Sequence, residues 1–421
     1  MTLGEQSDTI DDLAKPLILN PAIRCFEDGN GTYVLELDDR HGRTQRILAT
    51  PPVFRLLKRF STPRSWKMCS EELAIAGLHA EHIVALEQYL IRTCIQKRVL
   101  VLPGEQVFAN DQPKKPSYVN IAFEIFSPRV VNWVCRGLQY IFAAPVVLGG
   151  LVAILVGWMS LLIAMRHTET WPKLAASQVL AVASIATFGV LLHELGHAAS
   201  GYRIGTRRVS IGVGWYFAVP VAYSDLSELW RYPRNARILV NCAGVYMQGL
   251  LLSALMLSYY LGHHDIVCLT AAGATAASVL WNLNPFLRLD GYWVAADALR
   301  IYDLRTRSSL LLRLIIRNAL HRRKLFPNDA SLTLVAYALI AALFLTLMLL
   351  RIGGFAVTAL LTSIPSFVGK ICTAAWWSES TILDLVLTLS AITWQILLLC
   401  AGAYAIASMP RRLFLWWRSL P

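Results

Sequence analysis

Five consecutive residues carry the side chains that a catalytic metal site requires. His193, Glu194 and His197 lie in the sequence HELGH, which follows the pattern HExxH. On a helix the two histidines lie one turn apart on one face, so both imidazoles can bind one Zn²⁺, while the glutamate can take a proton from a water molecule at the metal. Chance gives this pattern in about 1% of chains of this length, and ionisable residues inside an apolar segment are rarer still. The spacing therefore predicts a catalytic zinc site.

A catalytic zinc ion usually has three protein ligands and one open position, so a third ligand must come from elsewhere in the chain. The best candidate is Asp290, in the sequence NLNPFLRLDG at 282–291. HELGH and the motif with Asp290 each lie near the same end of an apolar segment. The two segments are predicted to cross the membrane in the same direction, so both motifs are expected at the same depth in the membrane. Pro285 ends the preceding helix and Gly291 permits a tight turn, which would aim the carboxylate at the metal. Asp290 could instead be a helix-terminal acid at the lipid headgroups, whereas a competing cluster at 263–265 is predicted on the opposite face.

The composition indicates what kind of protein positions these residues. Of the 421 residues, 56% are apolar and only 16% are charged, and the mean hydropathy is +0.49. These values exclude an ordinary soluble protein and predict an integral membrane protein. The formal net charge of +12 is interpreted as basic residues that set the orientation of the chain in the membrane and contact lipid headgroups. No nucleic acid partner is expected. The eight cysteines form no CxxC pair, which argues against a disulfide framework and a cysteine zinc site.

Hydropathy predicts about six membrane spans. They cover residues 139–165, 175–201, 236–261, 266–287, 332–350 and 382–408. An interfacial helix is predicted at 121–133, and the segment 355–377, which proline and polar residues interrupt, is predicted to be re-entrant or to lie on the surface. With six spans the basic stretches fall on one side, so both termini are expected in the cytoplasm. The acidic first twenty residues do not resemble a cleaved signal peptide.

Residues 1–103 differ from the rest because they mix apolar and charged residues with the periodicity typical of a soluble protein. They are therefore expected to form a separate small α+β domain. Its predicted elements are strands at 22–26, 33–37 and 43–48, three helices between 51 and 98 with Ser70 capping the second, and a closing strand at 99–102. Residues 104–120 are predicted to be a linker, 121–310 a membrane core, and 311–421 C-terminal spans with a cytoplasmic tail. The expected fold class is therefore mainly α, a polytopic membrane helix bundle with a small N-terminal domain.

The motif HELGH in one predicted span and N-x-x-P-x-x-x-x-D-G in a later one resemble the site-2 protease family of intramembrane zinc metallopeptidases. The resemblance implies that His193, His197 and Asp290 are the zinc ligands, that Glu194 is the general base, and that Asn282 positions the substrate.

The likeness covers residues 120–310. The sequences VAYSD, WR and NLNP through DGY resemble those of the bacterial "putative peptide zinc metalloprotease" branch, which is often associated with peptide natural product clusters. This resemblance implies that the protein lies in the inner membrane of a bacterial cell. One departure is that Ala243-Gly244-Val245 stands where the family commonly has Gly-Pro. This difference is expected to affect local helix geometry but not the metal site.

Two segments are interpreted as peptide-binding elements. Residues 210–217 have extended, glycine-spaced character, and they would form either a strand edge that pairs with an unwound substrate or a plain interface loop. The order of elements in the N-terminal domain resembles a PqqD-like winged helix, which implies recognition of a leader peptide as an added strand. A DNA-binding winged helix is disfavoured because 80–97 has no basic recognition face, and a mere scaffold is the other alternative.

Together these expectations predict a membrane-embedded zinc endopeptidase that processes a ribosomal precursor peptide for maturation or export. Alternatives are regulated intramembrane proteolysis of a membrane-anchored regulator, and a non-catalytic peptide-binding or immunity protein. The expected cofactor is Zn²⁺. The expected partners are the precursor peptide or a membrane-anchored protein substrate, membrane lipid, and an exporter or modifying enzymes of the same pathway.

Overall fold

The chain divides into two compact units in a computed structural model. The first unit spans Met1–Lys114 and includes Glu228–Arg234, and the second comprises Lys115–Ser227 and Asn235–Pro421. The structure describes residues 15–27, 33–38, 44–77, 79–105, 122–168, 174–216, 219–301, 303–321 and 331–358, and the single positions 108, 361, 365, 386 and 393. Most of the predicted sixth span, of the predicted linker and of the segment 355–377 lies outside these residues.

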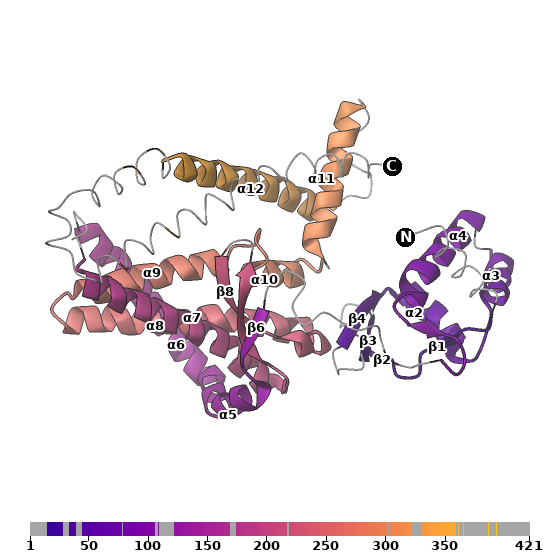
Figure 1. The fold of residues 1–421 in the computed structure, drawn as a ribbon, viewed down its shortest axis with the longest axis horizontal. Coiled ribbons are helices and arrows are strands. Elements are labelled where there is room, and N and C mark those ends of the chain that lie inside the picture. Colours follow the sequence, from indigo (N-terminus) through magenta and orange to yellow (C-terminus); the bar gives the residue numbers. More distant parts are fainter. Residues whose placement is uncertain are drawn as a thin grey trace. The chain divides into compact units, whose positions relative to one another are not determined.

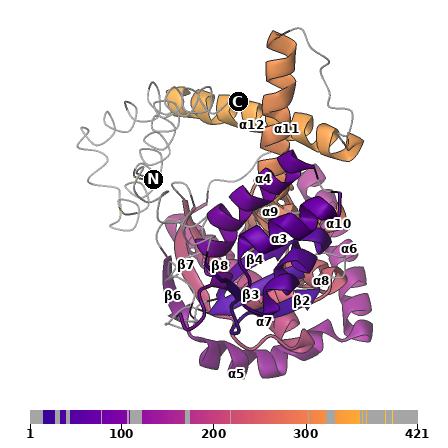
Figure 2. The same cartoon turned by 90° about the vertical axis from the view of Figure 1, so that its right-hand side faces the viewer.

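The N-terminal unit places a three-stranded antiparallel meander beside three helices, of which α3 and α4 lie side by side (Figures 1 and 2). Its elements are β1 Ile18–Leu19, β2 Arg24–Glu27, β3 Tyr33–Asp38, β4 Thr44–Ala49, α2 Pro51–Lys58, α3 Trp66–Ile75, α4 Ala80–Tyr89, the π-helical turn η2 Leu90–Ile95 and β5 Leu100–Val101. Leu35 in the central strand pairs with Cys25 and Ile47, and apolar residues of β3, β4, the helices and β5 enclose one core. The expected closing strand is β5, and it pairs with β1, which the sequence did not suggest.

The second helix of this unit begins earlier than the sequence indicated. Ser65, not Ser70, is the N-cap of α3, and its side chain accepts a hydrogen bond from the backbone N–H of Met68 at 3.5 Å. Ser70 lies inside the helix, where its hydroxyl donates to the backbone oxygen of Lys67. Trp66 is therefore part of the helix, and it is buried in the core.

The second unit is a bundle of apolar helices with a small three-stranded sheet beside them (Figure 1). Its elements are β6 Ala122–Phe126, α5 Pro128–Leu138, α6 Ala144–His167, α7 Ala176–Ile204, β7 Ile211–Tyr216, β8 Val219–Ser224, α8 Arg234–Leu261, α9 Ile266–Asn282, α10 Asp290–Ala298, α11 Leu304–Leu320 and α12 Leu332–Thr358. The short 3₁₀ helix η4, Ser227–Arg231, joins β8 to α8.

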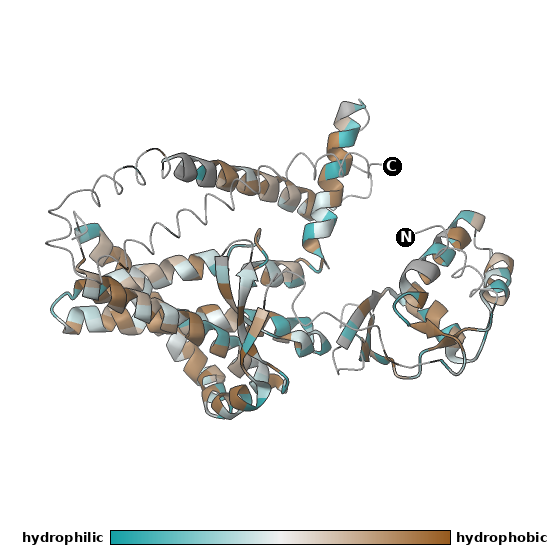
Figure 3. Ribbon diagram, viewed as in Figure 1, coloured by the Kyte–Doolittle hydropathy of each residue, from teal (hydrophilic) through white to brown (hydrophobic). Residues whose placement is uncertain are grey.

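Hydrophobic residues run along most of the helices of the second unit (Figure 3). Within the described residues, four helices are long and apolar enough to cross a membrane: α6, α7, α8 and the first 20 residues of α12. The predicted span at 266–287 is the 17-residue helix α9, which ends at Asn282. The chain is thus a mainly helical membrane protein, and the count of six spans remains a prediction.

Two sequence predictions in the second unit were wrong. The predicted interfacial helix at 121–133 is a strand followed by a helix, since β6 pairs with β7 and α5 begins only after Ser127. Pro128 explains the break, because the residue before a proline is disfavoured in helical conformation and proline suits the first turn. Within the segment at 210–217, Ile211–Tyr216 form the strand β7 and not a plain interface loop. The free edge that was predicted for this strand is wrong, because β7 is the central strand of the sheet order β6-β7-β8.

Candidate metal centre

Helix α7 carries the HExxH residues in a region of small side chains. His193, Glu194 and His197 are all buried, and the residues from Gly196 to Gly201 are small except for His197. A Cβ on Gly196 would lie 2.6 Å from the backbone oxygen of Ala243, so the two helices α7 and α8 approach closely at this point. The close packing buries the two imidazoles between helices instead of exposing them to lipid.

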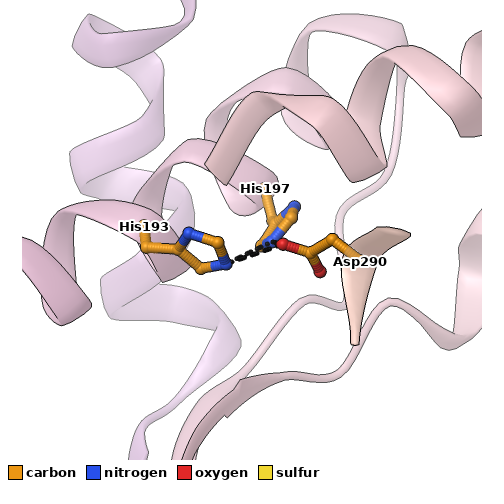
Figure 4. Close-up of side chains that lie close together, drawn as sticks. All are labelled: His193, His197 and Asp290. Carbon is orange, nitrogen blue, oxygen red and sulfur yellow. Dashed lines mark hydrogen bonds and ion pairs between the residues drawn. The ribbon is translucent and has the colours of Figure 1, made fainter. Parts of the chain in front are cut away.

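The two histidines and Asp290 converge on one point (Figure 4). The Asp290 Oδ2 atom lies 2.8 Å from His193 Nε2 and 3.2 Å from His197 Nε2. The two Nε2 atoms are 3.1 Å apart. The structure therefore brings together the two histidines and the aspartate that the sequence suggested as a ligand set.

This arrangement fits a zinc ion. Two ligand atoms of a tetrahedral zinc with bonds of about 2.0–2.1 Å are about 3.3 Å apart, close to the three separations found here. The Asp290 Oδ2 atom is buried and faces the two imidazole Nε2 atoms, as expected where three ligand atoms surround one metal position. Two imidazole nitrogens and one carboxylate oxygen are also a donor set that zinc prefers in catalytic sites.

Helix α8 orients both imidazoles although it supplies no ligand. The Nδ1 atom of His197 hydrogen bonds to the backbone oxygen of Val240 at 2.8 Å, and Nδ1 of His193 hydrogen bonds to Gln248 Oε1 at 3.1 Å. Gln248 in turn donates to Ser278 Oγ of α9 at 3.0 Å. Because an Nδ1–H bond to an oxygen fixes the tautomer, each Nε2 lone pair is directed at the metal position.

Gly244 of α8 lies directly against the two imidazole rings. A Cβ at this position would be 2.6 Å from His197 Nε2 and 2.7 Å from His193 Cε1. Any larger side chain at 244 would enter the space of the ligands, so the glycine present here leaves room for both rings. That the Ala243-Gly244-Val245 departure leaves the metal site untouched stays a prediction.

A turn between α9 and α10 brings Asp290 to the histidines. Pro285 follows the end of α9, and the side chain of Asn284 accepts the backbone N–H of Phe286 at 2.8 Å, which closes a local turn. Gly291 lies inside α10 with no positive φ, so the prediction that it makes a tight turn was wrong. Its role is close approach, since a Cβ would lie 2.1 Å from the backbone oxygen of Leu283.

The electrostatics keep Asp290 ionised. Burial alone would raise the pKa of its carboxyl, but the adjacent imidazoles of His197 and His193 lower that pKa below its ordinary value. An anionic carboxylate is the form that binds a divalent cation.

Glu194 is held by a residue whose role the sequence analysis missed. The hydroxyl of Ser224, the last residue of β8, donates to Glu194 Oε2 at 2.7 Å and also lies 3.1 Å from the backbone oxygen of Glu194. No spacing rule links these residues, which are thirty positions apart. The end of strand β8 therefore lies beside the motif, and one oxygen of Glu194 has a fixed donor.

Two other predicted candidates lie in different settings. Asn282 is the last residue of α9, and its side chain is half-buried and makes no hydrogen bond within the described residues, so its role toward substrate remains a prediction. Asp265, from the competing cluster, caps α9 by accepting the backbone N–H of Val267 at 2.9 Å. His264 stacks edge-on against Tyr259, so this cluster acts in the α8–α9 loop.

Comparison with known proteins adds a partial similarity. The chain is 33% identical over 104 residues to the "Putative peptide zinc metalloprotease protein YydH" of Bacillus subtilis (strain 168). The match covers 24% of this chain and 41% of the relative, so the chain spans less than half the length of the relative that it matches. No protein-family model matches the chain, and no solved structure matches it.

Proposed function

We propose that the protein is a membrane-embedded zinc endopeptidase of the site-2 protease type that cleaves a ribosomally made precursor peptide. The observation that carries the proposal is the convergence of His193, His197 and Asp290 in a buried site with Glu194 in the adjacent position of the same helix. The relative named a zinc metalloprotease supports the same reaction class and the same metal. A silent binding or immunity protein would have no physical need for an acid at 194 held by a dedicated donor.

The mechanism follows from the chain's own groups. Zinc, when bound by the two histidines and Asp290, would polarise the scissile carbonyl and lower the pKa of an attacking water molecule. Glu194 would accept the proton of that water and then deliver it to the leaving amine. The hydrogen bond from Ser224 would hold one carboxylate oxygen of Glu194 in place and leave the other free to exchange the proton. Asn282 would contact the substrate from the end of α9.

The substrate would reach the site as an extended strand. A peptide bond inside a helix must be unwound before it can be attacked, and a free sheet edge can hold the unwound backbone. Because β7 is paired on both sides, the candidate edge next to the site is β8, whose last residue Ser224 bonds to Glu194. We propose that the cleaved segment adds to the outer edge of β8.

The N-terminal unit would select the substrate. Its meander has order β2-β3-β4, so β2 and β4 are the edges of a small sheet on a compact core. We propose that this unit is a PqqD-like winged helix, and that a leader peptide adds to one of these edges while the membrane unit cuts in the inner membrane of the cell. Both termini would lie on the cytoplasmic side, and an exporter or modifying enzyme of the same pathway would act on the same peptide.

The test uses the full chain purified in detergent and peptides encoded beside its gene. Glu194→Gln should keep the zinc content and melting temperature of the wild type but reduce cleavage about 10²- to 10⁴-fold, because only the proton acceptor is lost. The control is Glu81→Gln, at an exposed residue of α4, which should cleave at the wild-type rate. Undiminished cleavage by Glu194→Gln would remove Glu194 from its role.

A second comparison separates precursor peptides from membrane-anchored regulators as substrates. If the proposal holds, removing the leader from the precursor should abolish cleavage by the full chain, and adding the free leader should inhibit cleavage of the intact precursor. Cleavage that is indifferent to the leader, together with cleavage of a membrane-anchored protein, would favour regulated intramembrane proteolysis instead.

A further inference from the structure

A buried ion pair joins α8 to the helix that carries Asp290. The guanidinium of Arg237 donates from Nε to Oδ1 of Asp297 at 3.0 Å and to Oδ2 at 3.2 Å, and its Nη2 also contacts Oδ1. The side chains are only 3% and 13% exposed. The pair is thus a two-pronged contact inside the membrane unit, and the mechanism above does not use it.

Each residue of the pair lies on a helix that also contributes to the metal site. Asp297 follows Asp290 by seven residues, which is about two helical turns, so both carboxylates lie on nearly the same face of α10. Arg237 precedes Val240 by three residues, and Val240 is the residue whose backbone oxygen holds His197. The face of α8 that meets the ligands therefore continues to the ion pair.

Helix α10 needs such an attachment. It has nine residues, starts at Asp290 after an irregular turn, and its N-cap residue Leu289 makes no side-chain hydrogen bond to the helix. A short helix of this kind has little intrinsic stability, so tertiary contacts must fix its position. Gly291 and Tyr292 fix the first turn, since Gly291 packs on Leu283 and Tyr292 is buried. Arg237 fixes the last turn.

A stability role alone does not explain the pair. A buried ion pair is a poor source of net stability, because removing two charges from water costs about as much as their attraction returns, and an apolar pair would pack as well. The planar fork of arginine on a carboxylate supplies geometric specificity instead. What it orients here is α10, and hence the carboxylate at the start of that helix.

We propose that Arg237 and Asp297 are positioning residues for the metal site, which set the direction and register of α10 so that Asp290 meets the two histidines. This inference rests on the proposed metal site, but it does not depend on which substrate is cut. It assigns a shared purpose to the inward face of α8, where Val240, Gly244 and Gln248 orient the imidazoles and Arg237 orients the carboxylate.

The experiment measures zinc affinity of the full chain in detergent by competition with a chelator, together with the absorption spectrum of the Co²⁺-loaded protein and the melting temperature. Arg237→Met and Asp297→Asn should each lower zinc affinity about 10- to 100-fold, the usual cost of losing a group that orients a ligand. Arg237→Lys should lose less, because it keeps the charge but not the fork. The cobalt spectrum of each variant should shift, since the carboxylate ligand is displaced.

A double-mutant cycle distinguishes positioning from general damage. In an Asp290→Ala background the carboxylate ligand is absent, so Arg237→Met should cause little further loss of zinc affinity. The control is Arg24→Met, which removes an ion pair with Asp38 in the other unit (2.7 Å) and should leave zinc affinity unchanged.

The outcomes separate this inference from the proposed function. Wild-type zinc affinity and cobalt spectrum in Arg237→Met, or the full loss of affinity in the Asp290→Ala background, would overturn the inference while the wild type still cleaves peptides. If Arg237→Met does not fold, Asp297→Asn and Arg237→Lys decide by the same criteria. A wild type that binds zinc but cleaves no peptide would overturn the proposed function and leave the inference standing, and a wild type that binds no zinc would overturn both.

Discussion

At the scale of single residues, the metal site depends on a position without a side chain. Gly244→Ala adds a methyl group 2.6 Å from His197 Nε2, in a helix where alanine is otherwise favoured by about 1 kcal/mol over glycine. We expect this variant to lose zinc binding because the imidazoles must turn away, and chelator competition would measure it. The matched control is Gly273→Ala in α9, where a Cβ meets nothing within 4 Å. Equal zinc affinities for the two variants would show that the rings have room to adjust.

Ser224 gives a prediction that concerns the base and not the metal. Ser224→Ala removes the donor to Glu194 Oε2, and a hydrogen bond to a charged group contributes about 1.5–3 kcal/mol, so the turnover number should fall about 10- to 100-fold. Zinc affinity should not change, because Ser224 contacts none of the proposed ligands. Ser224→Thr keeps the hydroxyl and should restore much of the rate. A serine-to-alanine variant that lost zinc instead would indicate a structural role for the strand end.

The sequence could predict the candidate ligands because their signals are local. HExxH is a spacing rule on one helix, and Asp290 stands after a proline break in a chain of otherwise apolar segments. Gln248 and Arg237 carry no spacing signal, since a polar residue in a predicted span does not identify its partner, and Gly244 stood out only as part of a departure from the family pattern. Their roles come from which helix faces which, and this is a property of packing that no spacing pattern contains.

At the scale of elements, the small sheet shows where hydropathy fails. Residues 122–126 are apolar and aromatic, which fits either an interfacial helix or a strand, and periodicity cannot separate the two in so short a run. What decides is the partner, because β6 pairs with β7, a strand almost ninety residues later in the chain. The long helices were predicted well because an apolar segment of about 20 residues has few alternatives in a membrane.

The packing of the N-terminal unit yields a prediction about thiol chemistry. Cys94 is fully buried, and burial raises the pKa of its thiol from 9.0 to about 12. Since the folded state holds this proton more tightly than the unfolded state, the thiol's contribution to stability is complete below pH 9 and is lost as the pH rises from 9 to 12, at up to about 1.4 kcal/mol per pH unit.

We therefore expect Cys94 to resist alkylation at pH 9, while exposed Cys25 is modified, and to react as fast as Cys25 once the unit is unfolded in urea. Mass spectrometry of the alkylated peptides measures both rates. The urea midpoints of the wild type and Cys94→Ala at pH 8 and pH 10 check the effect on stability. From pH 8 to pH 10 the midpoint of the wild type should fall relative to that of the variant. A constant gap would mean that Cys94 titrates normally in the folded unit.

At the scale of the whole molecule, the N-terminal unit is not a continuous stretch of sequence. It includes Glu228–Arg234, a segment that follows strand β8 and leads into α8. The reason is a buried contact within this unit, since Arg231 donates from Nε to Oε2 of Glu36 at 2.8 Å and its Nη2 atom lies 2.8 Å from the same oxygen. The two residues are 195 positions apart, which is why composition placed the end of the domain at 103 and did not reveal the returning segment.

This contact leads to a prediction about the integrity of the unit. Glu36 is 0% exposed and lies in the central strand β3, and Arg231 also lies over the ring of Phe26 in β2. Removing one partner of a buried ion pair costs up to about 3–5 kcal/mol, because the remaining carboxylate loses a compensating charge in a medium of low dielectric. Arg231→Met should therefore loosen the meander, whereas Arg59→Met, which breaks an exposed pair with Glu72, should cost at most about 1 kcal/mol.

The alkylation rate of Cys69 and Cys94 in the full chain measures this loosening, because both thiols are buried in the core beneath the meander. Arg231→Met should raise both rates by up to about 10²- to 10³-fold, because the opened population increases by the same factor, and Arg59→Met should leave them close to the wild type. Zinc affinity serves as the internal control, since the metal ligands belong to the other unit and should be unaffected. Unchanged thiol rates in Arg231→Met would mean that the core of the N-terminal unit holds β3 without the returning segment, and the unit would then be stable as a continuous domain.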